Sequence, residues 1–176
     1  DREKFGAFYE QLDGEQVPAT VMESVCTGPI SYTGQDELER DIANFKTALA
    51  KVNVTEGFLP VAAPASVIPD RRSDDDCLDA IGAAMAVEYK AVVDAGLLVQ
   101  LDDARAAVTF DRMVPPATMD DYRAWLNHHV EVTNRALEGI PPEKVRYHVC
   151  WGSWPGPHVT DVPLKEIIDL ILKINA

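Results

Sequence analysis

The feature of this sequence that most constrains its fold is an alternation of short β-branched runs with longer amphipathic segments. The short runs begin near residues 20, 58, 97 and 145, so they recur at about 40 residues, the length of one strand–helix unit. Strands that alternate with helices favour a parallel sheet, because each parallel connection needs a crossover. The alternation therefore predicts an α/β fold of four βα units, in one domain that spans residues 1–176.

The expected strands are short segments rich in valine, leucine and other apolar residues. They are residues 19–26, 57–64, 97–101 and 145–150. Segment 97–101 is almost continuously apolar, which is typical of a strand buried on both faces of a parallel sheet. Pro60 and Pro64 make segment 57–64 the weakest of the four, because proline cannot donate a hydrogen bond to a neighbouring strand.

The expected helices carry apolar residues at steps of three and four. They run from Gly34 to Val52, from Ser73 to Gly96, from Thr118 to Gly139 and from Leu164 to Ile174. The third should bury one face, made of Tyr122, Leu126, Val130, Thr133 and Leu137. His128 and His129 are adjacent on this helix, and we expect them to be solvated or packed at its edge.

Charge and cysteine content exclude several classes of function. Sixteen basic residues against 29 acidic ones give a net charge of −13, which repels nucleic acid and anionic membranes. No apolar run reaches the ~18 residues that a membrane-spanning helix needs. Three widely separated cysteines are not a disulfide framework, so we expect a reducing, cytoplasmic location.

In parallel α/β folds, ligands bind at the carboxyl ends of the strands, and one such end carries His148 and Cys150. Residues two apart on a strand share a face, so the imidazole and the thiol should point to the same side. Together they would be two of the three protein ligands of a tetrahedral zinc site with an open fourth position. The alternative is a packed cysteine and a hydrogen-bonded histidine.

The preceding strand ends in a second group of polar residues, in which Gln100 and Asp102 share a face. A carboxylate there is costly to bury unless it meets a cation, such as a substrate ammonium group, a metal or an arginine. We favour Asp102 over Asp103, because its position matches that of Gln100. A helix cap or a loop salt bridge is the alternative role for these acids.

The loop of residues 151–158 follows the His148–Cys150 strand and carries Trp151, Ser153 and Trp154. Tryptophans beside a strand end suit the wall of a flat or apolar ligand, so we expect Trp151 and Ser153 to contact a substrate. Plain packing of the loop is the alternative.

The segments from Gly96 to Asp103 and from Arg146 to Trp151 carry a resemblance to a known family. Their G-x-x-x-Q-x-D and H-x-C patterns resemble the catalytic barrel of cobalamin-independent methionine synthase. They are more similar still to the short, single-barrel proteins called methionine synthase-like. Asn134 also stands where this family tends to have asparagine.

The resemblance implies a (β/α)8 TIM barrel, of the type shared with uroporphyrinogen decarboxylase, of which this sequence would form about four βα units. It also implies zinc-dependent transfer of a methyl or other alkyl group to a small-molecule thiol such as homocysteine. His148 and Cys150 match two zinc ligands of the family, and Asp102 matches the carboxylate that receives the substrate's amino group. A folate-type compound or another small alkyl donor would supply the alkyl group.

The sequence also departs from the family pattern. Asp102-Asp103-Ala104 stands in place of Asp-Glu-Pro, and the family's Gly-Glu-Phe segment has no counterpart. The family's remaining ligands, a Glu and a second Cys, would lie beyond Ala176, so we expect the sequence to be part of a longer protein.

Two other functions remain open from the sequence. One is a metal-independent enzyme related to uroporphyrinogen decarboxylase, which would need basic residues around its pocket. The candidates for that role are Arg71, Arg72, Arg105 and Arg112. The other is a non-catalytic binding module, a half barrel that completes itself by dimerisation; the sequence leaves the oligomeric state open.

Overall fold

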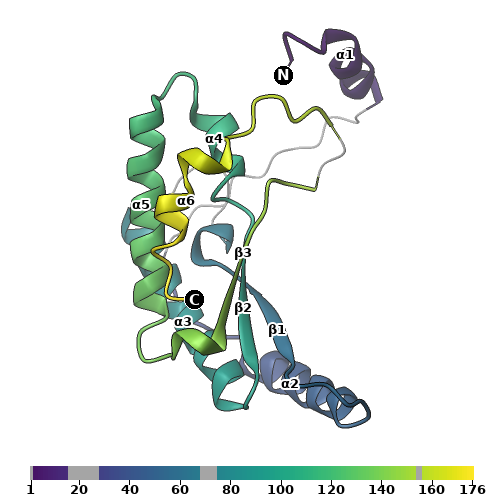
Figure 1. Cartoon of the computed structure of the whole chain (residues 1–176), viewed down its shortest axis with the longest axis vertical. Helices are drawn as coiled ribbons and strands as arrows, with labels where there is room; N and C mark the ends of the chain where they lie inside the picture. Colours follow the sequence, from purple (N-terminus) through teal and green to yellow (C-terminus); the bar gives the residue numbers. More distant parts are fainter. Residues whose placement is uncertain (1, 16–27, 68–74, 154–155) are drawn as a thin grey trace.

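The computed structural model describes residues 2–15, 28–67, 75–153 and 156–176, and these contain a parallel three-stranded sheet. Its strands are β1 (Phe58–Ala62), β2 (Leu98–Asp103) and β3 (Val145–Val149), in the order β1-β2-β3 (Figure 1). Three of the four expected strands are thus confirmed, and the α/β class and the parallel pairing with them. The expected strand at residues 19–26 lies outside the described residues.

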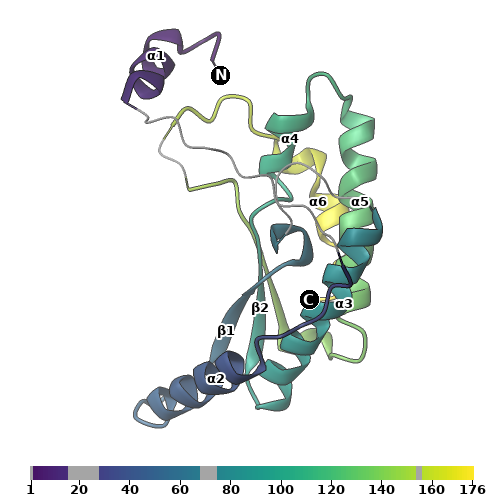
Figure 2. The ribbon, with the colours of Figure 1, turned by 180° about the vertical axis from the view of Figure 1, so that it is seen from behind.

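Six α-helices accompany the sheet in the described part of the chain. They are α1 (Gly6–Glu15), α2 (Gln35–Leu49), α3 (Asp75–Asp94), α4 (Val108–Met113), α5 (Met119–Ala136) and α6 (Ile168–Ile171). The positions of α2, α3 and α5 confirm three of the helices expected from periodicity. The sequence pattern did not predict α1, which has no buried residue and lies apart from the sheet (Figures 1 and 2). None of the described helices has the length and apolar character that crossing a bilayer requires.

The prediction of a (β/α)8 TIM barrel is wrong. The described residues form a small, open sheet, in which β2 pairs on both sides while β1 and β3 each pair with β2 alone. A barrel closes only when every strand has two neighbours. The repeat of strand and helix predicts parallel pairing of neighbouring strands, but it does not determine whether a sheet closes.

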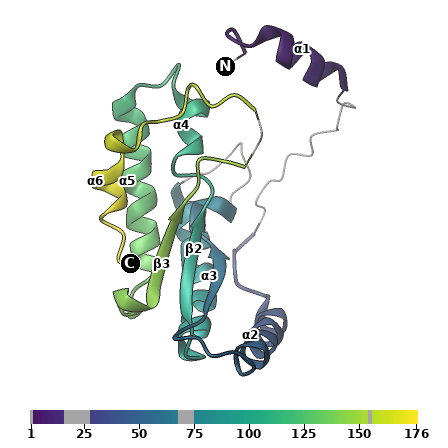
Figure 3. The same ribbon diagram turned by 45° about the vertical axis from the view of Figure 1, so that its right-hand side comes forward.

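The two faces of the sheet have different surroundings, because α3 and α5 cover the same one (Figures 1 and 3). On the covered face Val61, Val99, Leu101 and Val145 are buried. On the other face Gln100 and Asp102 are only partly buried, and Arg146 and His148 are exposed. We call these the covered face and the open face. The expectation that β2 is buried on both sides is therefore wrong, because the described helices pack on one side only.

Local sequence signals explain the ends of several elements. Thr118 and Asp121 form a capping box at the start of α5, where each side chain hydrogen-bonds to the other residue's backbone N–H. Pro60 is tolerated in β1 because, in the part of the chain that the structure describes, β1 pairs with β2 alone and is an edge strand. Figure 2 shows α2 beside the amino end of β1, and Leu38 and Phe45 of α2 pack against the core there.

The expected helix from Leu164 to Ile174 is shorter than predicted. A 3₁₀ turn (Leu164–Glu166) precedes α6, and Ile167 between them has φ −131°, which interrupts the helix. The segment instead docks on α5 through Asn134, whose amide donates to the carbonyl of Lys173 at 2.8 Å and accepts from the N–H of Asn175 at 2.9 Å. Asn134 therefore has a structural role that the resemblance alone did not reveal.

Helices α3 and α5 pack closely at Gly82, where a Cβ atom would lie 2.7 Å from Cγ1 of Val132. Val132 is buried, and a β-branched side chain in a helix has one strongly preferred rotamer, so it cannot easily move away.

We expect Gly82→Ala to lower the free energy of unfolding by about 1 kcal/mol, because overpacking costs about 1–3 kcal/mol and the better helix former returns only about 1. In a Val132→Ala background the same substitution should be neutral or stabilising. Urea unfolding of the four proteins in this double-mutant cycle measures the coupling. Strictly additive effects would contradict the close contact.

Candidate functional site

The candidate site lies at the carboxyl ends of β2 and β3, where two adjacent acidic residues point to opposite faces of the sheet. Strand β2 runs to Asp103, two residues further than the sequence predicted. Because side chains alternate along a strand, Asp102 lies on the open face and Asp103 on the covered face. Asp102 is partly buried, whereas Asp103 is 0% exposed.

On the open face the structure brings Asp102 and His148 to neighbouring positions, because they are Cα partners across β2 and β3. Gln100 precedes Asp102 on the same face, and its amide donates to the Asp102 carboxylate at 2.8 Å. His148 is exposed and Cys150 is partly buried. The four predicted residues therefore belong to two adjacent strand ends.

The sulfur of Cys150 lies in a turn that supplies it with a backbone hydrogen bond. The N–H of Gly152 donates to Sγ of Cys150 at 3.2 Å, and Gly152 has φ +94°, a conformation that favours glycine. The N–H of Cys150 donates to the carbonyl of Asp103 at 3.0 Å, which extends the pairing of β2 and β3 beyond Val149. Neither Cys77 nor Cys150 forms a disulfide.

The other residues expected at the site have different positions. The indole N–H of Trp151 donates to the carbonyl of Val162 at 3.0 Å, and the ring packs against a second core cluster with Leu126 and Ile167. Ser153 is exposed. Trp154, like Cys26, Arg71 and Arg72, lies outside the described residues. The contacts of Trp151 match the loop-packing alternative, and its predicted contact with a substrate stays a prediction.

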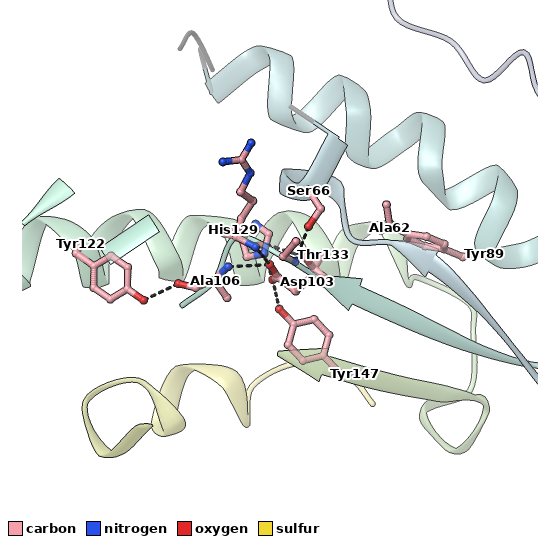
Figure 4. Close-up of polar contacts among 11 residues, drawn as sticks. Ala62, Ser66, Tyr89, Asp103, Ala106, Tyr122, His129, Thr133 and Tyr147 are labelled. Carbon is pink, nitrogen blue, oxygen red and sulfur yellow. Dashed lines mark hydrogen bonds and ion pairs between the residues drawn. The ribbon is translucent and has the colours of Figure 1, made fainter. Parts of the chain in front are cut away.

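On the covered face, Asp103 is the centre of a buried polar cluster (Figure 4). Its carboxylate contacts Nε2 of His129 at 2.5 Å and accepts a hydrogen bond from the hydroxyl of Tyr147. It also accepts from the backbone N–H groups of Arg105 at 2.8 Å and Ala106 at 2.7 Å. Four donors from α5, from β3 and from the loop after β2 thus converge on one carboxylate.

These contacts determine the ionisation of Asp103. Burial by itself raises the pKa of the carboxyl group, but the charge and hydrogen bond of His129, with the bonds from Tyr147 and Ala106, lower it to about 2. Burial raises the pKa of Tyr147, and the charge and hydrogen bond of Asp103 raise it further. Asp103 is therefore ionised at neutral pH and Tyr147 keeps its proton.

Two further tyrosines donate hydrogen bonds to backbone carbonyls at the neighbouring strand ends. The hydroxyl of Tyr89, on α3, donates to the carbonyl of Ala62 at the end of β1 at 2.7 Å. The hydroxyl of Tyr122, on α5, donates to the carbonyl of Ala106 after β2 at 2.6 Å. Figure 4 shows both contacts around the Asp103 cluster. Helices α3 and α5 thus fix the backbone of this end of the sheet through side-chain hydroxyls.

His129 was not among the predicted site residues; it is 0% exposed and does not lie at the helix edge as expected. Its ring stacks on Trp125, with centroids 5.6 Å apart and an angle of 7° between the planes. A signal was present, because residue 129 is three after Leu126 and four before Thr133, on the predicted inner face. The sequence also gave preference to Asp102, and nothing in it paired Asp103 with a residue 26 positions away.

The metal-binding capacity of the site can be assessed from its donor atoms. Imidazole and thiolate are ligands that zinc prefers, and His148 and Cys150 supply one of each at one strand end. Among the residues that the structure describes, no three His, Cys, Asp or Glu side chains converge as a metal site. The described residues therefore fit zinc in the kind of ligand, and a zinc site here would need ligands beyond His148 and Cys150.

Comparison with known proteins adds no relative: no family model, no curated protein and no solved structure matches this chain. The resemblance drawn from the two strand motifs stays a hypothesis.

We expect the ionised Asp103 to stabilise the fold above pH 4 and this contribution to disappear as the pH falls from about 4 to about 2. The folded protein binds the Asp103 proton less tightly than the unfolded chain, so acid favours unfolding, by an amount on the order of 2 kcal/mol. Asp103→Asn should unfold more easily at pH 7 and lose this part of the acid dependence.

Urea unfolding at a series of pH values measures this effect. Asp102→Asn is the matched control, because it removes the adjacent carboxylate from the open face, where the side chain is only partly buried. Equal effects of the two substitutions would contradict the assignment of the buried charge to Asp103.

Proposed function

We propose that this chain contributes to an enzyme that transfers a methyl or other alkyl group to a small-molecule thiol, with zinc as the cofactor. The observation that carries the proposal is the adjacency of two polar groups on one open sheet face. His148 and Cys150 offer metal ligands, and Asp102 is the register partner of His148. A thiol that also carries an ammonium group, as homocysteine does, could contact both groups at once.

Zinc held by His148 and Cys150, with ligands from outside the described residues, would act as a Lewis acid that keeps the substrate sulfur as a thiolate at neutral pH. The N–H of Gly152 would support this role by orienting the sulfur, because its hydrogen bond holds Sγ of Cys150 in the turn. The exposure of His148 leaves its ring accessible from the open face.

Asp102 would hold the acceptor by its ammonium group, and Gln100 would orient the carboxylate through its 2.8 Å hydrogen bond. The acceptor's thiol proton leaves to solvent when the thiolate forms. The sulfur then attacks the alkyl carbon of the donor: a carbon–sulfur bond forms, and the bond to the leaving group breaks with its electron pair on that group. Asp102 thus positions the nucleophile and takes no proton in the step.

Metal binding is the first test. The protein, purified with zinc and freed of loosely bound metal, should retain the ion, and His148→Ala and Cys150→Ala should each lose most of it. Cys77→Ala is the matched control, because Cys77 is also a partly buried thiol, lies on α3 and is not one of the predicted ligands. Metal content by mass spectrometry gives the stoichiometry. Zinc content that both site substitutions leave unchanged would refute the proposal.

Substrate recognition is the second test. Homocysteine should bind more tightly than its analogue without the amino group, and Asp102→Asn should remove this preference. The expected loss is about tenfold or more, because a hydrogen bond to a charged group is worth about 1.5–3 kcal/mol. Calorimetry with the two thiols measures the preference. An Asp102→Asn protein that keeps it would show that another group receives the ammonium.

A further inference from the structure

Asp103 is attached to β3 at two points, on both sides of His148. Its carboxylate accepts the hydroxyl hydrogen bond of Tyr147, which precedes His148. Its backbone carbonyl accepts the N–H of Cys150 at 3.0 Å. His148, which lies between these two contacts, and Cys150, which makes the second contact, are the two predicted zinc ligands.

The third attachment links Asp103 to α5, which is a rigid element of 18 residues. His129 contacts the carboxylate with Nε2, and its own place is fixed by the stacked ring of Trp125. The hydroxyl of Thr133 donates to the carbonyl of His129 at 2.9 Å and is also buried. The position of Asp103 is thus set by a helix that lies on the covered face, away from the open face.

We propose that Asp103, His129 and Tyr147 form a positioning clamp for the candidate site, and this inference rests on the proposed function for the role of His148 and Cys150. The clamp lies on the covered face and touches neither substrate nor metal. It acts through the backbone: by fixing the end of β3 against the end of β2, it keeps the register that puts Asp102 and His148 on the open face, with Cys150 directly after the strand.

The clamp gives a reason for burying the Asp103 charge at this place. Two apolar side chains could pack there without the cost of removing a carboxylate from water. A buried carboxylate must keep its hydrogen-bond donors, because a buried carboxylate without them is strongly destabilising. The strand ends can therefore adopt only the arrangement that keeps the donors of His129, Tyr147, Arg105 and Ala106 on Asp103. Such polar constraints specify a single geometry more sharply than apolar contacts do.

The test uses substitutions that remove one donor with little change of shape. Tyr147→Phe removes only the hydroxyl, and His129→Leu replaces the imidazole, with its donor nitrogen, by an apolar side chain that can still pack against Trp125. His129→Gln offers an amide N–H near the position of Nε2 and should rescue the clamp. Val92→Ala, at the amino end of the sheet, is the control for loss of stability without loss of the clamp, because Val92 is buried and its carbonyl contacts the N–H of Leu97.

The first readout is hydrogen exchange of the Cys150 amide relative to the Leu98 amide, which donates to the carbonyl of Gly57 at the opposite end of the sheet. Tyr147→Phe and His129→Leu should accelerate Cys150 about tenfold relative to Leu98. His129→Gln should restore most of the protection, and Val92→Ala should leave the ratio unchanged. A ratio that the clamp variants leave unchanged, or that Val92→Ala changes equally, would overturn the inference.

The second readout is the absorption of bound Co²⁺, whose thiolate charge-transfer band reports contact with Cys150. The clamp variants should bind the ion about 10–100 times more weakly, with a weaker band, while Val92→Ala should match the wild type. If the wild-type protein binds no metal, the proposed function fails, and the exchange ratio still decides whether the clamp positions the strand end. If it binds metal and the variants bind equally well, the clamp fails and the function stands.

Discussion

The buried carboxylate of Asp103 is the constraint on which this end of the molecule depends. Moving an isolated carboxylate out of water costs several kcal/mol, so the charge can stay only where donors replace the lost water. The donors come from α5, from β3 and from the loop that follows β2. Elements that are distant in the sequence are therefore held together by the need to satisfy one charge.

The same constraint separates two acids that are adjacent in the chain. Asp103 is committed to the interior, where its charge holds the backbone in place. Asp102, on the opposite side of the strand, has Gln100 as its hydrogen-bond partner and is only partly buried. A strand gives this division without any further device, because alternate residues face opposite ways. The burial of Asp103 thus determines that its neighbour Asp102 lies on the open face.

The sequence predicts much of this fold but only part of the site. Periodicity located α2, α3 and α5, and the β-branched runs located β1, β2 and β3, because those patterns reflect which local faces are buried. The pairing of His129 with Asp103 joins residues 26 positions apart, and no local pattern specifies it. The closure of the sheet is likewise not specified by a local pattern. Open sheets and closed barrels share the same strand–helix repeat, so the repeat does not predict a barrel.

The tyrosines at the strand ends have a consequence for the protein in alkali. The pKa values of Tyr89, Tyr122 and Tyr147 are all raised, mainly by burial, so each hydroxyl stays protonated in the fold at a pH where the unfolded chain would release the proton. Their contribution to stability is complete below about pH 10 and declines as the pH rises further. Ionised tyrosine absorbs light differently from the neutral ring. The absorption of these tyrosines in alkali therefore reports when the fold opens at the ends of β1 and β3.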